Sequence, residues 1–299
     1  MDESGRPQVE RGEKGRDAKG NAYEEPMTKE IPIKNIKIGG GRPIVLIAGP
    51  CVIESELKLM KAAEEIVKAV EALNAPLIFK SSFDKANRSS ASSYRGPGIK
   101  EGLRLLAKVR ETFGVPVISD VHSASEVGPA SEVLDALQIP AFLCRQTDLL
   151  TAAAKSGLPV NVKKGQFMAP WDVGNILNKF RTAGSDDLMF TERGVSFGYN
   201  NLVVDFRSLS IMRPLGCPVI FDATHSVQLP GGAGTASSGQ REFVAPLSRA
   251  AAAVGIDGLF LEVHPCPDEA LCDGPNMVSI PEMAGIMEQV MAIDQALRG

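Results

Sequence analysis

Residues 79 to 96 gather side chains that are suited to binding phosphate. The stretch reads Phe79-Lys-Ser-Ser-Phe-Asp-Lys-Ala-Asn-Arg-Ser-Ser-Ala-Ser-Ser-Tyr-Arg-Gly96 and contains a single acidic residue. Guanidinium groups bind phosphate bidentately, an ammonium supplies a point charge, and hydroxyls supply neutral donors. The alternative is a solvated basic loop. We favour a phosphate site because the stretch follows an apolar run that reads as a buried strand, and α/β folds place their sites at the carboxyl ends of strands.

Short apolar runs alternate with amphipathic stretches from residue 43 onward, which predicts strands followed by helices. This alternation predicts a (β/α)8 TIM barrel. A doubly wound open sheet fits the same alternation, but no GxGxxG follows an early strand to support it. The predicted strands are Ile44–Ala48, Leu77–Lys80, Val117–Asp120, Ala141–Leu143, Val160–Lys163, Leu188–Thr191, Val219–Asp222 and Gly258–Val263, and a predicted helix at 124–136 precedes the fourth of them.

The amino-terminal part of the chain differs from the rest in composition. Residues 1–30 are charged, contain glycine and have few aliphatic side chains, so we expect a disordered tail. Residues 31–38 alternate apolar and polar side chains before a run of glycines, which predicts a short β-hairpin. We therefore expect a single barrel domain over residues 31–299.

The composition excludes several classes of protein. A net charge of −4 disfavours nucleic acid as the main partner. No apolar run approaches the roughly 20 residues that cross a bilayer, and the start of the chain has no apolar signal segment. Five scattered cysteines without a CxxC pair suit a reducing compartment. We expect a cytoplasmic protein that binds neither membranes nor nucleic acids.

Polar residues end each predicted strand, and these ends supply candidate metal ligands. The sequence spacing does not select among them, although a thiolate, an imidazole and carboxylates together suit Zn, Fe(II) or Mn. We interpret the two cysteines that flank the acidic loop, Cys266 and Cys272, as structural. The candidates are Cys51, His122, His225, Glu262, His264 and Asp273.

Eight longer motifs occur along the chain, namely residues 47–51 (IAGPC), 79–90 (FKSSFDKANRSS), 118–122 (ISDVH), 138–148 (QIPAFLCRQTD), 161–167 (NVKKGQF), 191–194 (TERG), 221–228 (FDATHSVQ) and 241–243 (REF). Together they resemble 3-deoxy-D-manno-octulosonate 8-phosphate synthases, in particular the metal-dependent subgroup with a cysteine at position 51. The resemblance covers about residues 31–297. It implies a (β/α)8 barrel, a homotetramer, and the condensation of phosphoenolpyruvate with D-arabinose 5-phosphate in lipopolysaccharide biosynthesis.

The resemblance also implies a role for individual residues. A divalent metal ion (Fe, Zn or Mn) would be held by Cys51, His225, Glu262 and Asp273. Phosphoenolpyruvate would be bound by Lys80, Lys85, Gln138, Lys163 and Arg193. Arabinose 5-phosphate would be bound by Asn87, Arg88 and Ser89, with Phe142 and Arg145 contributed by a neighbouring subunit. We expect catalytic roles for Lys85, Asp120, His225 and Asp273.

Three other functions stay open on the sequence. A 3-deoxy-D-arabino-heptulosonate 7-phosphate synthase would use erythrose 4-phosphate, but members of that family carry Lys-Pro-Arg-Thr-Ser where this chain has Lys85-Ala-Asn-Arg-Ser-Ser90. An aldolase would form a Schiff base on Lys163 or Lys164. A non-catalytic barrel would bind phosphorylated sugars as a sensor and release no phosphate.

Overall fold

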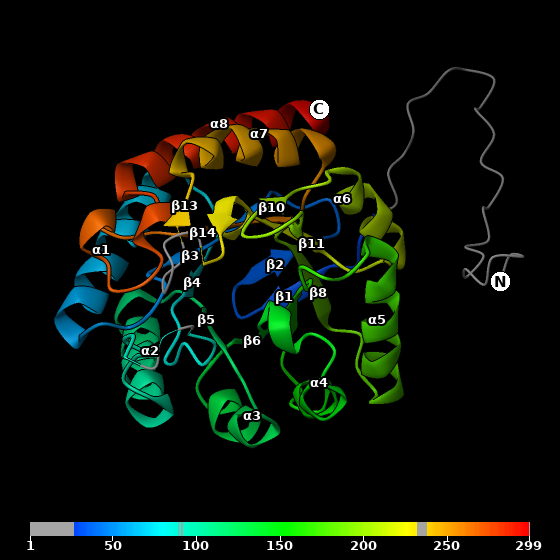
Figure 1. Cartoon of the computed structure of the whole chain (residues 1–299), viewed down its shortest axis with the longest axis horizontal. Helices are drawn as coiled ribbons and strands as arrows, with labels where there is room; N and C mark the ends of the chain where they lie inside the picture. The colour runs from blue at the N-terminus through cyan, green and yellow to red at the C-terminus, as the bar shows by residue number, and fades with distance from the viewer. Residues whose placement is uncertain (1–26, 89, 91, 232–237, 299) are drawn as a thin grey trace, which may run out of the picture.

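The computed structural model describes residues 27–88, 90, 92–231 and 238–298. Eight parallel strands close into a barrel and follow one another around it in chain order. This arrangement confirms the predicted (β/α)8 barrel (Figure 1). The strands are β3 (Val45–Gly49), β4 (Leu77–Lys80), β5 (Val117–Asp120), β6 (Ala136–Ile139), β7 (Val160–Lys163), β8 (Leu188–Glu192), β11 (Val219–Asp222) and β14 (Gly258–Glu262).

Helices surround the barrel and cover the outward face of its strands (Figure 1). The apolar side chains between helices and strands form the larger hydrophobic core, as expected for strands that are buried on both faces. None of the described helices is long and apolar enough to span a lipid bilayer. The helices are α1 (Glu56–Ala72), α2 (Ile99–Phe113), α3 (Ala124–Ser131), α4 (Thr147–Ala154), α5 (Val173–Thr182), α6 (Arg207–Met212), α7 (Val244–Val254) and α8 (Ile280–Arg298).

The prediction for the fourth barrel strand is wrong. That strand is β6 (Ala136–Ile139), and the predicted strand at 141–143 is a 3-10 helix with Phe142 exposed. Because Pro140 follows β6 and cannot donate a ladder hydrogen bond, the strand ends there. The helix predicted to reach residue 136 stops at Ser131.

The predicted amino-terminal hairpin is confirmed. Strands β1 (Ile31–Ile33) and β2 (Ile36–Ile38) pair antiparallel, and Lys34 in the turn between them has a φ of 52°. The apolar side chains of the hairpin join the inward-facing residues at the start of the barrel strands in a second core cluster. The hairpin therefore closes the end of the barrel at which the strands begin.

The folded chain already includes residues that precede the hairpin. The Thr28 hydroxyl donates to Asp257 over 2.9 Å and is buried, and the Lys29 ammonium lies 2.7 Å from Asp187. The predicted disordered tail otherwise lies outside the described residues.

The inward-facing positions change from apolar to polar along six of the eight barrel strands. Side chains two residues apart on a strand point to the same face. On each of these strands one inward-facing residue packs against the hairpin, and the next inward-facing residue lies nearer the opposite end of the barrel. This pattern places a polar layer across the carboxyl end of the barrel, here called the mouth. The pairs are Ile78 and Lys80, Ile118 and Asp120, Ala136 and Gln138, Met189 and Thr191, Ile220 and Asp222, and Phe260 and Glu262.

Two short antiparallel ribbons belong to loops that follow barrel strands. Strand β9 (Val195–Ser196) pairs with β10 (Leu202–Val203) after β8. Strand β12 (Gln228–Leu229) pairs with β13 (Ser238–Gly239) after β11. The segment that joins β12 to β13 includes residues 232–237, which lie outside the described part of the chain.

Candidate active site

The polar layer at the mouth forms one hydrogen-bonded chain across the barrel. Each of its members is buried, so each would be costly without a partner. The chain runs from strand β8 back to strand β4. Its bonds are Thr191 Oγ1 to Asn161 Oδ1 (2.7 Å), Asn161 Nδ2 to Gln138 Oε1 (3.0 Å), Gln138 Nε2 to Asp120 Oδ1 (2.6 Å), Ser82 Oγ to Asp120 Oδ2, and Lys80 Nζ to Ser82 Oγ (2.8 Å).

Lysine ammonium groups surround a buried carboxylate beside this chain. The Lys80 Nζ lies 3.3 Å from Asp120 and 3.6 Å from Glu262, and the Lys85 Nζ lies 3.3 Å from the same Glu262 oxygen. Burial alone would raise the pKa of Glu262, but Lys85, His225 and Lys80 together hold it well below its usual range. Glu262 is therefore ionised at neutral pH.

A second charged group joins strands β7 and β11. The Asp222 carboxylate accepts from the Lys163 ammonium and from His225 Nδ1, the latter over 2.6 Å. The Lys163 Nζ also lies 3.4 Å from the centroid of the Phe260 ring. Burial lowers the pKa of Lys163 to about 8, although Asp222 opposes the shift. The other ring nitrogen of His225, Nε2, lies 3.5 Å from Glu262, so the imidazole connects the two buried carboxylates.

Asp273 connects several of these groups from the loop after β14. Its Oδ2 accepts from the Cys51 thiol over 3.4 Å, and its Oδ1 lies 3.6 Å from Arg88 Nη1 and 3.5 Å from Gln228 Nε2. Gln228 in turn accepts from Arg193 Nη2 over 3.1 Å. Asp273 therefore lies between the thiol of Cys51 and two arginines.

Several buried polar atoms at the mouth have no hydrogen-bond partner among the described residues. They include Arg193 Nη1, Arg88 Nε and Nη2, and Glu262 Oε2. Unpartnered buried groups of this kind are costly unless a ligand satisfies them. Guanidinium donors suit a phosphate, and a carboxylate oxygen suits a cation.

Two overlapping groups of side chains could hold a metal ion. In each group the donor atoms lie within 4.8 Å of one another, and Asp273 belongs to both. Burial, with Glu262 and Asp273 nearby, raises the pKa of the Cys51 thiol well above its usual value, so the thiol keeps its proton until a cation displaces it. The groups are His225, Glu262 and Asp273, and Cys51, Cys272 and Asp273.

Most of the predicted site residues converge at the mouth, but those assigned to arabinose 5-phosphate do so only in part. Arg88 reaches Asp273, whereas Asn87, Phe142 and Arg145 are exposed on loops. Ser89 lies outside the described residues.

The remaining candidates have other partners. His122 Nδ1 lies 3.3 Å from Glu126, and His264 Nδ1 lies 2.7 Å from the backbone oxygen of Cys266. Lys164 is fully buried, and its Nζ lies 3.4 Å from Glu192 and 3.3 Å from the Met168 oxygen.

The sequence interpretation missed two residues that the structure places at the site. Gln228 links an arginine to Asp273; it ends the motif at 221–228, but the residue type alone gives no role for it. Cys272 lies in no metal-binding sequence pattern, which predicts a structural role, yet it belongs to one of the two candidate groups. Its position next to Asp273 was the signal that could have revealed it.

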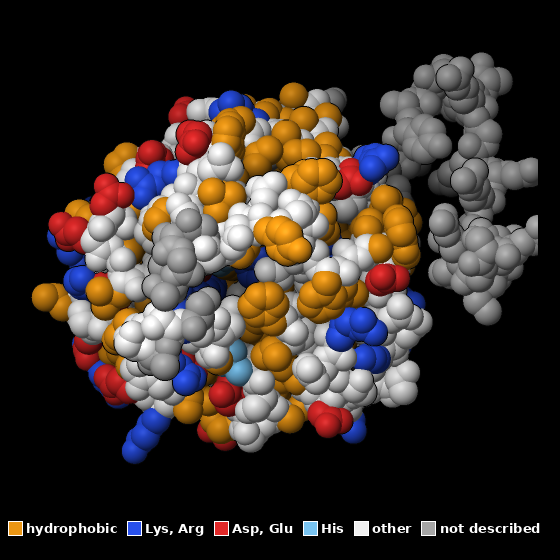
Figure 2. Space-filling model, in the orientation of Figure 1, with side chains coloured by type: hydrophobic (Ala, Val, Ile, Leu, Met, Phe, Trp, Pro, Cys, Tyr) orange, Lys and Arg blue, Asp and Glu red, His pale blue; other side chains and the backbone are white. Residues whose placement is uncertain are grey.

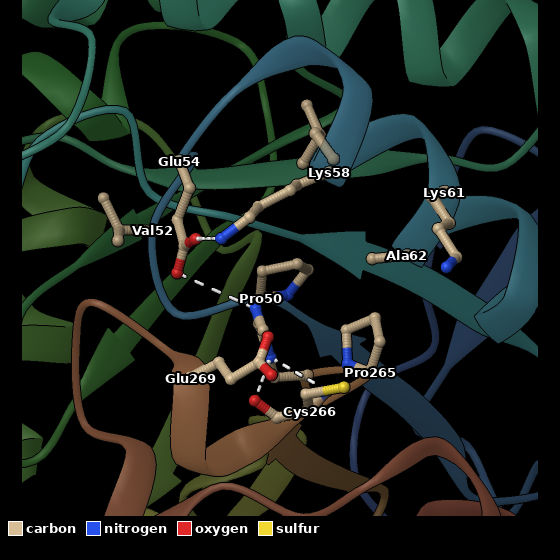
Figure 3. A pocket seen from close by; sticks show the side chains of 11 residues that line it. Pro50, Val52, Glu54, Lys58, Lys61, Ala62, Pro265, Cys266 and Glu269 are labelled. Atoms are coloured by element: carbon tan, nitrogen blue, oxygen red, sulfur yellow. Dashed lines mark hydrogen bonds and ion pairs between the residues drawn. The ribbon is translucent and has the colours of Figure 1, made fainter.

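A small pocket of about 140 Å³ lies between the start of α1 and the loop after β14 (Figure 3). The Glu54 carboxylate in this pocket lies 2.6 Å from the Lys58 ammonium and 3.7 Å from His264 Nε2. The same carboxylate accepts from the backbone N–H of Leu271 over 2.9 Å. Glu54 therefore ties the loop of Cys51 to the loop of Asp273.

Comparison with known proteins identifies the family. Residues 22–298 match the model of the DAHP synthetase I family, and the chain belongs to that family. It is 62% identical over 272 residues to the 2-dehydro-3-deoxyphosphooctonate aldolase of Geobacter metallireducens, covering 91% of this chain and 100% of that protein. The proteins of the same name from Geotalea uraniireducens and Desulfotalea psychrophila are 60% and 61% identical, over 91% and 88% of this chain and 100% and 94% of theirs.

Proposed function

We propose that this protein is a 3-deoxy-D-manno-octulosonate 8-phosphate synthase, a transferase that condenses phosphoenolpyruvate with D-arabinose 5-phosphate and water and releases phosphate. The main observation in support is the set of buried basic side chains at the mouth, in which Arg193 Nη1 has no partner among the described residues. The name of the relatives supports the choice of sugar, because an octonate has eight carbons. Three carbons of phosphoenolpyruvate and five of arabinose give eight, whereas erythrose would give seven.

Phosphoenolpyruvate would bind over the polar chain at the mouth. Lys80 on β4 and Lys163 on β7 are buried in the barrel and would neutralise its negative charges. Arg193 Nη1, which has no partner among the described residues, would bind the phosphate, and Gln138 would supply a neutral contact beside Asp120. Lys85 completes the set of residues that we assign to this substrate.

Arabinose 5-phosphate would bind through Asn87, Arg88 and Ser89, next to the first substrate. Two buried nitrogens of Arg88 without a partner in the described structure support a phosphate contact. We assign Phe142 and Arg145 to the site of a neighbouring subunit, because both are exposed here.

A homotetramer would supply that neighbour. Hydrophobic side chains gather near the middle of the face seen in Figure 2. Exposed aromatic residues on loops that follow β6, β7 and β8 support a subunit contact on these loops, because aromatic residues are enriched in interfaces. They are Phe142, Phe167, Trp171, Phe197 and Tyr199.

A divalent metal ion, Fe, Zn or Mn, would be held by Cys51, His225, Glu262 and Asp273. The donor set fits a borderline ion because it combines a thiol, an imidazole and two carboxylates. Glu262 Oε2, which has no partner among the described residues, supports the assignment. When bound, the ion would polarise or acidify an oxygen at the reacting carbons.

The side chains of the mouth would divide the remaining work. Lys85 and Lys163 position two anionic substrates that otherwise repel each other, so that the enol carbon reaches the sugar aldehyde. As that bond forms, the second carbon of phosphoenolpyruvate becomes electron-poor and takes up water, and Asp120 stabilises the positive charge. His225, held by Asp222 through Nδ1, orients this water, and Asp273 accepts one proton from it. That proton ends on the former aldehyde oxygen, which becomes a hydroxyl. The resulting hemiketal phosphate then releases phosphate by carbon–oxygen cleavage.

This reaction would take place in the cytoplasm, where phosphoenolpyruvate is made, and would serve lipopolysaccharide biosynthesis. Phosphate release from phosphoenolpyruvate tests the proposal, with arabinose 5-phosphate or erythrose 4-phosphate as the acceptor, before and after chelation. We expect release with arabinose 5-phosphate, lost on chelation and restored by Mn, Fe or Zn. Release only with erythrose 4-phosphate would identify a heptulosonate synthase, and binding without release would identify a sensor. Borohydride trapping of a substrate adduct would identify a Schiff-base aldolase.

A further inference from the structure

Cys272 lies in the metal-binding region but has no role in the proposed reaction. Its thiol, the Cys51 thiol and an Asp273 oxygen all lie within 4.8 Å of one another. Ligand atoms on a tetrahedral ion with metal–sulfur bonds of 2.3 Å are about 3.8 Å apart. The three donors therefore need only a small movement to bind one ion.

The backbone conformation of the loop after β14 places both Cys272 and Asp273 close to Cys51. Asp273 has a φ of 51°, a left-handed conformation that is uncommon for a residue other than glycine. The loop is held on both sides, because Glu54 accepts from Leu271 N–H over 2.9 Å and Arg241 donates to the Gly274 oxygen over 2.7 Å. Figure 3 shows Glu54 beside Lys58, from where it anchors the start of this loop.

The two thiols belong to one small cluster of buried apolar residues. Cys51 is 0% exposed and Cys272 is 4% exposed, and they share a small cluster with Val52 and Met277. Buried cysteines often serve only as small hydrophobic residues. Cys272 differs from such a residue because a second thiol and a carboxylate oxygen lie within reach of the same ion.

We propose that Cys272 is a second thiolate ligand, which gives this region a donor set of Cys51, Cys272 and Asp273 that prefers thiophilic ions such as Cd²⁺ or Zn²⁺. The inference rests on the metal centre of the proposed function, because the two donor sets share Cys51 and Asp273. Soft thiolates favour such ions, whereas carboxylate and imidazole ligands suffice for Mn²⁺. On binding, each thiol loses its proton to solvent and forms a metal–sulfur bond.

The test is a titration of the metal-free, full-length protein with Cd²⁺ and, separately, with Mn²⁺. The ultraviolet charge-transfer absorbance per bound Cd²⁺ reports the number of thiolate ligands. Cys272→Ser should lower the Cd²⁺ affinity by at least about tenfold and roughly halve this absorbance, while the Mn²⁺ affinity changes little. Cys217→Ser is the matched control, because Cys217 is also 4% exposed and belongs to neither candidate group.

The outcomes separate this inference from the metal centre itself. Equal Cd²⁺ affinity and absorbance in wild type and Cys272→Ser would overturn the role of Cys272. If Cys51→Ser changed the affinity for neither ion, the proposed metal centre would fail instead. Cadmium NMR of the wild type gives an answer without a variant, because a shift typical of two thiolates supports the inference and one typical of a single thiolate contradicts it.

Discussion

The catalytic efficiency (kcat/KM) with phosphoenolpyruvate should fall as the pH rises through about 8, because Lys163 loses its proton there. This fall is called the alkaline limb below. Its side chain is buried beside Phe260, and burial lowers its pKa from 10.5 to about 8 even though Asp222 accepts from it. In the proposed function its ammonium group attracts the anionic substrate. Loss of that proton removes the charge on which substrate binding depends.

The magnitude follows from the titration of a single group. With a pKa of about 8 in the free enzyme, kcat/KM for phosphoenolpyruvate should fall to about half its plateau at pH 8 and about a tenth at pH 9. Deprotonation of Lys163 lowers the activity but raises the stability of the folded protein. Between pH 8 and 10.5 the unfolded chain binds the Lys163 proton and the folded chain does not, so this residue makes folding more favourable as the pH rises. A loss of stability caused by deprotonation of Lys163 therefore cannot explain the alkaline limb of the activity.

Lys163→Arg supplies the control, because an arginine stays charged throughout this range. The variant should lose the limb near pH 8 even if its plateau is lower than that of the wild type. The assay is initial-rate phosphate release at subsaturating phosphoenolpyruvate from pH 6.5 to 9.5, with circular dichroism at each pH. The same limb in both proteins, or a flat wild-type profile, would refute the assignment of the limb to Lys163.

Other substitutions test the proposed metal ligand Cys51, the bridging amide of Gln228 and the packing around Gly49. Cys51→Ser should weaken metal affinity by about ten- to a hundred-fold and lower activity with it, as equilibrium dialysis and phosphate release would show; near-wild-type, metal-stimulated activity would contradict its role. Gln228→Leu removes the bridge between an arginine and an aspartate, so KM for phosphoenolpyruvate should rise by about tenfold while kcat changes less, and an unchanged KM would exclude the bridge from substrate binding. Gly49→Ala places a Cβ 2.0 Å from the Lys80 backbone oxygen and should cost about 3 kcal/mol in chemical denaturation, whereas Gly285→Ala, which meets no atom within 4 Å, should stabilise by up to about 1 kcal/mol. Equal stabilities of these two variants would contradict the close approach at Gly49.

The sequence predicted the barrel because most of its strands are apolar and short. It failed at the fourth strand, where the inward position two residues after Ala136 is Gln138. A polar residue inside a short apolar run hides a buried strand from a rule that looks for continuous apolar residues. The apolar run 141–143 then looked more like a strand, although Phe142 is exposed on a 3-10 helix.

The residues of the candidate site that the sequence did not reveal depend on loop geometry. Cys272 reaches the other donors from a loop in which Asp273 has a left-handed φ. Aspartate adopts this conformation more often than most residues, but its presence does not predict where a loop will turn. Gln228 acts through two long contacts from the base of a hairpin. Such positions depend on how loops fold against one another, which periodicity does not record.

The alternation of inward and outward side chains along the strands couples the packing of the core to the geometry of the site. Ile78 packs against the hairpin that closes one end of the barrel, and Lys80, two residues later on the same face, lies among the charges at the mouth. A shift of one residue in the pairing of β4 would turn both side chains outward. It would then bury an ammonium against the apolar helix layer and leave Asp120 and Glu262 without one of their cations. The burial that fixes the strand register therefore also fixes which charges face the substrate.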